Sequence, residues 1–282
     1  MASFTPSARR ITRLQLGLLF RAYRERAGLS SKEAAQALDW YQAKMSKLEK
    51  GGVTMAAAEV DRLLDTYGVT GDDADKMRSL AREARRRAPL YHVAEWAQTY
   101  LDLEQAATEV KVYHCELVPG MLQTEDYARA IVSAWPTNTP EDIEQRAVER
   151  SRRLDRFTGP NPPHLWAVLG EAVLCREVGG PQVLLTQLRH LREVATRRNV
   201  TLQVLPFSGG EHIALESSFT IFELTEPVVA TFVYLETMTD ADYLDRPPHT
   251  DAYSLAFTKL PAIAASERDS LRMLDKRIKD LE

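Results

Sequence analysis

The stretch that decides the fold is residues 28–51, which read GLSSKEAAQALDWYQAKMSKLEKG. Within it, Ser30 and Glu33 stand three positions apart at the start of a helical pattern, and this spacing predicts a capping box. Asp39-Trp40 is expected to form a tight turn, and a second short helix is expected to begin near Tyr41. The second helix has few apolar residues and several Gln, Lys and Ser side chains, as a helix that enters a DNA major groove requires.

Helices are also predicted on both sides of this pair. Apolar residues recur at helical spacing over about 13–27, from Met55 to Tyr67, and from Gly71 to about Ala88. A glycine follows each of the first two segments as a stop signal. The pattern therefore predicts an all-α helix-turn-helix domain over residues 1–88.

The charge of the chain is unevenly distributed. The 282 residues carry a formal net charge of −4. Residues 1–90 hold 17 Lys and Arg against 11 Asp and Glu, whereas residues 91–282 hold 19 against 29. A basic N-terminal third on an acidic body is typical of a polyanion-binding module attached to another domain. Because the acidic body repels DNA, we expect DNA contact to be confined to the basic end.

Several pieces of residues 14–69 stand in the order and at the offsets of a known family. They are Ala27-Gly28-Leu29-Ser30, Glu33-Ala34-Ala35, Lys44-Met45-Ser46-Lys47-Leu48-Glu49-Lys50-Gly51 and Tyr67-Gly68-Val69. Together they resemble the helix-turn-helix domain of the Xre/Cro/C1 repressor family. The resemblance implies that Gln42, Lys44 and Lys47 face base edges or nearby phosphates. It also implies that Ser31, Lys32 and Ser46 lie against the DNA backbone. Glutamine can pair with adenine, and lysine can reach guanine acceptors or phosphate.

One position departs from that family pattern. The family usually places a small capping residue at the start of the recognition helix, where this chain has Tyr41. Two options follow: Asp39 caps the helix instead, or the first turn of the helix is less stable because it has no cap. Either option affects the orientation of Gln42. A different interpretation of the whole N-terminal region is a protein-interaction bundle of four or five helices whose lysines are merely solvated.

The larger C-terminal region, residues 89–282, is predicted to be mixed α/β, which makes the chain α+β overall. Strands are expected over 110–114, 165–169, 200–204, 219–224 and 228–235. Helices are expected to start at Thr124, to cover about 140–156 and 180–198, and to run from Ser266 to the C-terminus.

This region also carries a resemblance. Val118-Pro119-Gly120-Met121-Leu122-Gln123-Thr124-Glu125-Asp126-Tyr127-Ala128-Arg129 resembles the signature of DUF5753, an actinobacterial domain of unknown function, and shorter pieces follow in order to about residue 275. In that family the domain follows an Xre-type helix-turn-helix, as here. The resemblance implies a regulator of development or secondary metabolism, often encoded beside a small DUF397-type protein that is a possible partner.

The sequence offers little sign of catalysis. It contains no GxSxG, HExxH, P-loop or GxGxxG pattern, and its two cysteines do not form a CxxC pair. We therefore expect no enzyme activity, no catalytic residue, no cofactor and no metal site. Glu171 and Glu236 stand at the ends of predicted strands, where α/β folds often bind ligands. His212 stands in the loop Ser208-Gly209-Gly210-Glu211-His212, where the glycines allow close backbone approach and a histidine can titrate near neutral pH. All three are candidates for an effector pocket. The alternatives are a helix-capping carboxylate for Glu171, a surface turn for His212 and a solvated carboxylate for Glu236.

These observations predict a cytoplasmic transcriptional regulator that is nucleoid-associated when bound. The chain has no apolar run long enough for a membrane span and no secretory signal. We expect a homodimer on a double-stranded DNA operator, controlled by a small-molecule effector or a small protein partner. Two further hypotheses remain open: an antitoxin-like protein that neutralises a DUF397-type partner and autoregulates, and an enzyme anchored to DNA.

Overall fold

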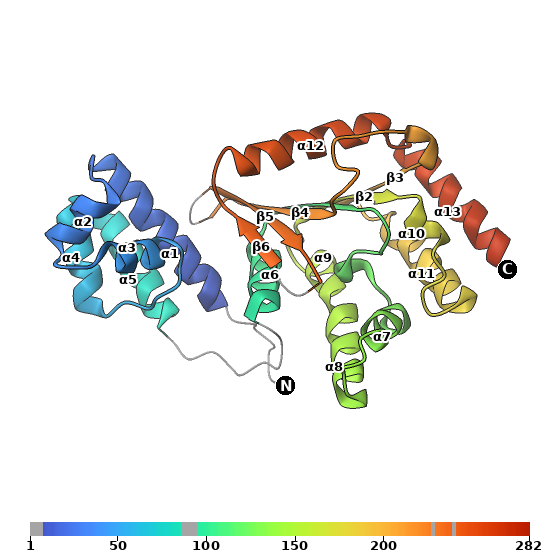
Figure 1. The fold of residues 1–282 in the computed structure, drawn as a ribbon, viewed down its shortest axis with the longest axis horizontal. Coiled ribbons are helices and arrows are strands. Elements are labelled where there is room, and N and C mark those ends of the chain that lie inside the picture. Colours follow the sequence, from blue (N-terminus) through green and yellow to red (C-terminus); the bar gives the residue numbers. More distant parts are fainter. Residues whose placement is uncertain (1–7, 86–94, 227–228, 239–240) are drawn as a thin grey trace. The chain divides into compact units, whose positions relative to one another are not determined.

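A computed structural model describes residues 8–85, 95–226, 229–238 and 241–282 (Figure 1). Its internal contacts divide the chain into two compact units. The first contains residues 1–106 with 224–229, and the second contains residues 107–223 with 230–282. The first unit is helical and the second is built on a mixed sheet, which confirms the predicted α+β class. The predicted domain boundary at residue 88 falls in 86–94, outside the described residues.

The first unit consists of six helices within the ranges that the structure describes. They are α1 (Ala8–Arg26), α2 (Ser31–Ala37), α3 (Gln42–Glu49), α4 (Ala57–Tyr67), α5 (Gly71–Ala84) and α6 (Glu95–Ala106). The predicted turn between α2 and α3 is present, with Asp39 in the left-handed conformation at φ 57°. There the Trp40 amide donates to the Ala35 carbonyl at 2.8 Å. The helix-turn-helix inferred from residues 28–51 is therefore formed.

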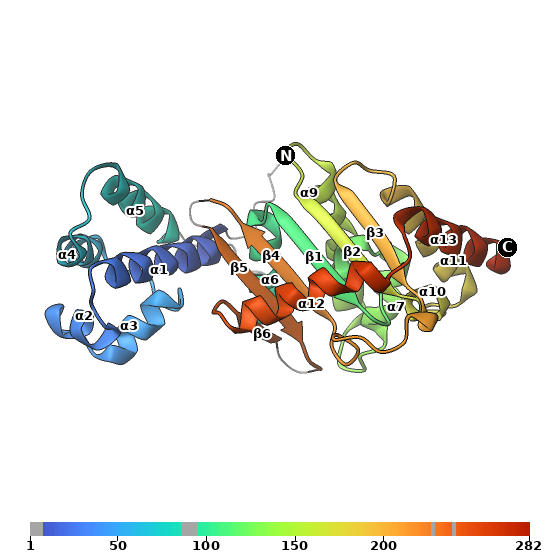
Figure 2. The ribbon, with the colours of Figure 1, turned by 90° about the horizontal axis from the view of Figure 1, so that it is seen from above.

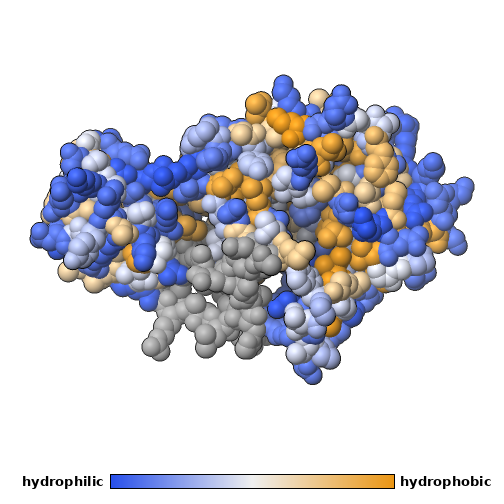
Figure 3. Space-filling view, in the orientation of Figure 1, coloured by the Kyte–Doolittle hydropathy of each residue, from blue (hydrophilic) through white to orange (hydrophobic). Residues whose placement is uncertain are grey.

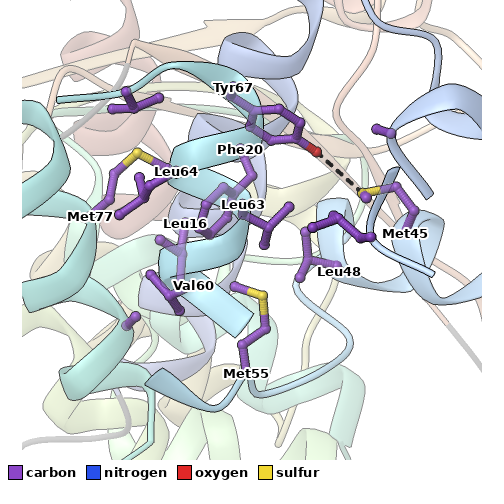
Figure 4. Packing of buried hydrophobic residues seen from close by; sticks show 14 of the residues in the cluster. Leu16, Phe20, Met45, Leu48, Met55, Val60, Leu63, Leu64, Tyr67 and Met77 are labelled. Atoms are coloured by element: carbon purple, nitrogen blue, oxygen red, sulfur yellow. Dashed lines mark hydrogen bonds between the residues drawn. The ribbon is translucent and has the colours of Figure 1, made fainter. Parts of the chain in front are cut away.

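The core of the first unit holds α3 by its apolar side. Phe20 of α1 and Leu63 of α4 are fully buried, and Met45 and Leu48 of α3 pack with them (Figure 4). The Tyr67 hydroxyl lies 3.6 Å from the Met45 sulfur. Apolar burial contributes about 25 cal/mol per Å². Turning α3 so that Met45 and Leu48 face solvent would lose this contribution, so the packing fixes which side of α3 faces inward. The polar side of the helix is left facing outward.

Two glycines allow α1 and the end of α3 to touch backbone to backbone. A Cβ added to Gly17 would lie 2.6 Å from the Leu48 carbonyl oxygen and 2.7 Å from that of Glu49. Gly51 has φ +67°, and a Cβ there would lie 2.8 Å from the Leu14 nitrogen. Only glycine fits such close approach, so both positions are fixed by the packing of α1 on α3.

The second unit is built on six strands, β1 (Glu109–His114), β2 (His164–Gly170), β3 (Val200–Leu205), β4 (Phe219–Leu224), β5 (Ala230–Glu236) and β6 (Ala241–Leu244). Their order in the sheet is β3-β2-β1-β4-β5-β6 (Figure 2). β1 and β2 are parallel, as are β2 and β3. β4 pairs antiparallel with β1, and β6 pairs antiparallel with β5. All five predicted strands are present, and β6 is an additional edge strand.

Helices cover both faces of this sheet. They are α7 (Glu125–Ser133), α8 (Pro140–Ser151), α9 (Asp155–Thr158), α10 (Ala172–Cys175), α11 (Pro181–Val194), α12 (His249–Ile263) and α13 (Glu267–Leu281), with short 3₁₀ turns η1 (Gly120–Leu122), η2 (Arg152–Leu154) and η3 (Phe207–Gly209). α12 lies on one face and α7 and α8 on the other (Figure 1). The helix predicted over 140–156 is wrong as a single element, because η2 interrupts it between α8 and α9. α12 was not predicted; it buries Phe257 and Leu260 against Phe219 and Val233 of the sheet.

The segment that resembles DUF5753 is a hydrogen-bonded connection between β1 and α7. Gln187 of α11 is fully buried, and its carbonyl oxygen accepts from the Thr124 amide at 2.8 Å. The Gln187 amide group donates to the Leu122 carbonyl, also at 2.8 Å. The Gln123 amide group donates to the Val118 carbonyl at 2.8 Å. Thr124 stands at the start of α7 as predicted, but its hydroxyl donates to Gln187 rather than capping the helix.

Candidate nucleic-acid interface

The outward side of α3 carries three of the six residues predicted to contact DNA. Gln42 and Lys47 are exposed, and Ser46 is partly exposed. Met45 and Leu48 point to the core from the opposite side of the same helix. In the view of Figure 3, hydrophilic residues cover most of the visible surface of the helical unit. The packing thus presents an amide, a hydroxyl and an ammonium group together on one short helix.

The start of α2 carries two more of the predicted residues. Ser31 is partly exposed and Lys32 is exposed, in the first turn of the helix. The predicted capping box is confirmed: the Glu33 amide donates to the Ser30 hydroxyl at 3.2 Å, and the Ser30 amide donates to the Glu33 carboxylate at 2.8 Å. Hydrogen bonds to the Glu33 carboxylate from the Ser30 side chain and then from the Ser30 amide hold the pKa of Glu33 below its usual value. The cap fixes the direction in which the first turn of α2 faces.

Lys44 already has partners within the protein. Its ammonium lies 2.5 Å from the Glu59 carboxylate of α4 and 3.9 Å from the centre of the Trp40 ring. Glu59 also accepts from the Ala56 amide at 2.9 Å. The Lys44 hydrogen bond, followed by the Ala56 one, lowers the pKa of Glu59. Lys44 therefore ties α3 to α4, and any contact that it makes with DNA competes with these partners.

The start of α3 has no side-chain cap. Tyr41 is the N-cap residue, and its side chain makes no capping hydrogen bond. Asp39 does not replace it: Asp39 stands two residues before the N-cap in the left-handed conformation, and its carboxylate lies 3.8 Å from Arg62 of α4. The sequence left two options open, a cap by Asp39 or a helix start without a cap. The structure shows the second: α3 begins without a side-chain cap.

The end of α3 is held by a buried ion pair that the sequence did not reveal. Arg24 Nε lies 2.5 Å from Glu49 Oε1, and Nη2 donates to Oε2 at 3.2 Å. The side chains are only 9% and 6% exposed. Arg24 Nη1 also donates to the Leu29 carbonyl at 2.7 Å, and the Glu49 hydrogen bond raises the pKa of Arg24. The pair joins α1, the turn before α2 and α3.

The three candidate effector residues of the second unit have separate surroundings. The Glu171 carboxylate accepts from the Phe207 amide at 2.7 Å. His212 Nδ1 accepts from the Ala214 amide at 3.3 Å, and burial lowers the pKa of this histidine. Glu236 is exposed at the end of β5. Within the described ranges, no hydrogen bond or ion pair joins any two of the three candidates. The bonds from Phe207 to Glu171 and from Ala214 to His212 hold loop segments of the fold.

No group of three or more His, Cys, Asp or Glu that could hold a metal ion is found among the described residues. Within that coverage, no helix is long and apolar enough to cross a membrane.

Comparison with known families matches both parts of the chain. Residues 15–77 match a family described as a helix-turn-helix domain. Residues 97–276 match a family described as a domain of unknown function, DUF5753. No curated protein matches the chain. The combination is that of a helix-turn-helix regulator with a C-terminal DUF5753 domain, and the helix-turn-helix indicates DNA binding and a role in regulating transcription.

Proposed function

The chain belongs to the DUF5753 family, and from its helix-turn-helix domain we propose that it is a sequence-specific regulator of transcription. The observation that carries the proposal is the geometry of α3. Its apolar side is anchored by Met45 and Leu48, and its polar side is open to solvent. A short helix held in this way can present side chains to the base edges of a major groove.

The proposed contacts divide by the chemistry of the side chains. Gln42 and Lys47 reach base edges or nearby phosphates, because amide and ammonium groups match the acceptors and donors of the major groove. Ser31, Lys32 and Ser46 lie against the DNA backbone and fix the register of the domain. Lys44 joins them by exchanging the Glu59 carboxylate for a phosphate oxygen, at the cost of the link between α3 and α4.

Two further features complete the proposal. A homodimer places two copies of α3 about 34–36 Å apart on a pseudo-palindromic operator. The distance between the two half-sites of the operator therefore tests whether the protein binds as a dimer. The second unit controls this arrangement by binding a small molecule or a small protein of the DUF397 type, rather than by catalysis. The ligand must bind the two states with different affinity, a difference of about 1–3 kcal/mol. The proposed place of action is the cytoplasm, on the nucleoid.

The test is to map the DNA bound by the full-length chain across its own genome and in a random duplex pool. We expect discrete sites that share a pseudo-palindromic sequence. The same mapping with Lys47→Ala and Gln42→Ala should lose or broaden that sequence. Lys76→Ala is the matched control, because Lys76 is an exposed lysine on α5. No enriched sequence, or the same enrichment in all variants, would refute the proposal.

A further inference from the structure

Tyr41 is an aromatic residue whose side chain lies almost entirely in solvent, where its ring makes no stabilising contact with the described part of the free protein. Its side chain is 88% exposed, the highest value among the large apolar side chains in the described ranges. The neighbouring Trp40 is partly buried, packs against the core and lies over the Lys44 ammonium. Only one of these two adjacent aromatic side chains therefore stabilises the domain by packing.

Tyr41 occupies the N-cap position of α3, where a tyrosine stabilises the helix less than a residue that can cap it. Its backbone has the N-cap conformation, with φ −73° and ψ 143°. Its carbonyl accepts from the Lys44 amide at 2.9 Å, but its side chain leaves the first amides of α3 without a cap. Ser, Thr, Asp or Asn at an N-cap favours folding by a factor of about 2 to 30 over a residue that cannot cap. The chain thus has a residue here that contributes neither a cap nor packing.

We propose that Tyr41 determines sequence specificity, with its ring packed against the C5-methyl group of a thymine and its hydroxyl donating to a phosphate oxygen. The thymine methyl is the apolar feature of the major groove, and tyrosine combines an apolar body with a polar tip. Tyr41 directly precedes Gln42 at the N-terminal end of α3, and the N-terminal residues of a recognition helix are the ones that contact base edges. The inference rests on the function proposed above.

The experiment separates capping from DNA recognition. Tyr41→Ser supplies a cap and removes the ring, and Tyr41→Phe keeps the ring and removes the hydroxyl. Ala56→Ser is the matched control: Ala56 is the exposed N-cap residue of α4, and its side chain makes no capping hydrogen bond. The probe is the duplex that the full-length wild-type chain selects from a random pool. Versions of it carry deoxyuridine, which lacks the methyl group, in place of each thymine in turn.

Tyr41→Ser and Ala56→Ser should both raise the thermal midpoint, but only Tyr41→Ser should weaken binding, by about tenfold. Wild type should lose affinity at one deoxyuridine position per half-site, and Tyr41→Ser should be insensitive there. Tyr41→Phe should keep that sensitivity while binding all sequences more weakly. The inference fails, with the proposed function intact, if Tyr41→Ser binds like wild type or keeps the deoxyuridine response. Both fail if the wild-type chain selects no sequence.

Discussion

Replacing Glu49 by Gln tests whether the buried ion pair holds the recognition helix in place. The substitution keeps the size of the side chain and removes its charge. The Arg24 guanidinium then stays buried opposite a neutral amide, whose oxygen is one acceptor; the Leu29 carbonyl at 2.7 Å and the Glu25 carboxylate at 3.3 Å are two others. Glu25 is 56% exposed, so it is the weaker of these last two partners.

The magnitude follows from the burial of the pair. Removing one partner of a buried ion pair costs about 3–5 kcal/mol, because the other charge stays desolvated. Since Arg24 retains these three acceptors and loses only the charge of its buried partner, we expect Glu49→Gln to lie at the lower limit, about 3 kcal/mol. In a domain of about 60–100 residues, each kcal/mol lowers the melting temperature by roughly 4–8 °C, so the expected shift is about 12–24 °C.

Hydrogen exchange on the full-length chain measures this effect at α3 itself. The amides of Met45 and Leu48 lie in the helix that the pair holds, and their exchange reports the opening free energy of this unit. Arg24→Met with Glu49→Leu is the paired control, because replacing a whole buried ion pair by apolar side chains is often neutral. The reasoning is refuted if Glu49→Gln costs less than about 1 kcal/mol, or if the double variant is as unstable as the single one.

Three further outcomes are expected. Gln42→Ala should cost about 1–3 kcal/mol of operator binding and relax the preference at one base position, as measured by competition with mismatched duplexes; retained specificity would show that Gln42 points away. Lys47→Ala should weaken binding and lower the slope of log affinity against log salt by about one, whereas Lys76→Ala should leave the slope unchanged. Burial, with the charge of Arg153, lowers the pKa of His114 from 6.5 to about 4. The unfolded chain therefore binds a proton that the folded chain does not, and stability falls as pH drops from 6.5 to 4. Denaturant unfolding at both ends of this range should show a smaller drop for His114→Gln, and an equal drop would contradict the assignment.

Features set by neighbouring residues could be predicted from the sequence. Ser30 and Glu33 form the expected capping box. Gly68 ends α4 with φ 67°, and the Ser266 hydroxyl accepts from the Asp269 amide at the start of α13. These signals are local, because a helix end is determined by the bonding of residues three or four positions apart.

Features that depend on tertiary packing could not be predicted from the sequence. α12 has Pro261 inside it, and it is stabilised by burial of Phe257 and Leu260 against the sheet rather than by a regular apolar stripe. β6 has four residues and pairs with β5 at the edge of the sheet. Neither signal is visible in the segment alone.

The same distinction holds for the candidate interface. The helical period shows which residues of α3 face outward, so the exposure of Gln42 and Lys47 was predictable. The partner of Lys44 was not, since Glu59 is 15 residues away and meets it only through the packing of α4 on α3. The bond from the Phe207 amide to Glu171 likewise spans 36 residues between β2 and the turn after β3.

The contact through Gly17 and Gly51 has a mechanical consequence. Where two backbones touch, no side chain lies between them that could change rotamer and absorb a displacement. α1 and α3 are therefore expected to turn as one rigid body. A rotation applied to α1 is therefore expected to be transmitted to α3, and in the dimer proposed above it would change the angular position of one α3 relative to the other along the DNA groove. A side chain at either glycine would introduce a permanent offset of the same kind.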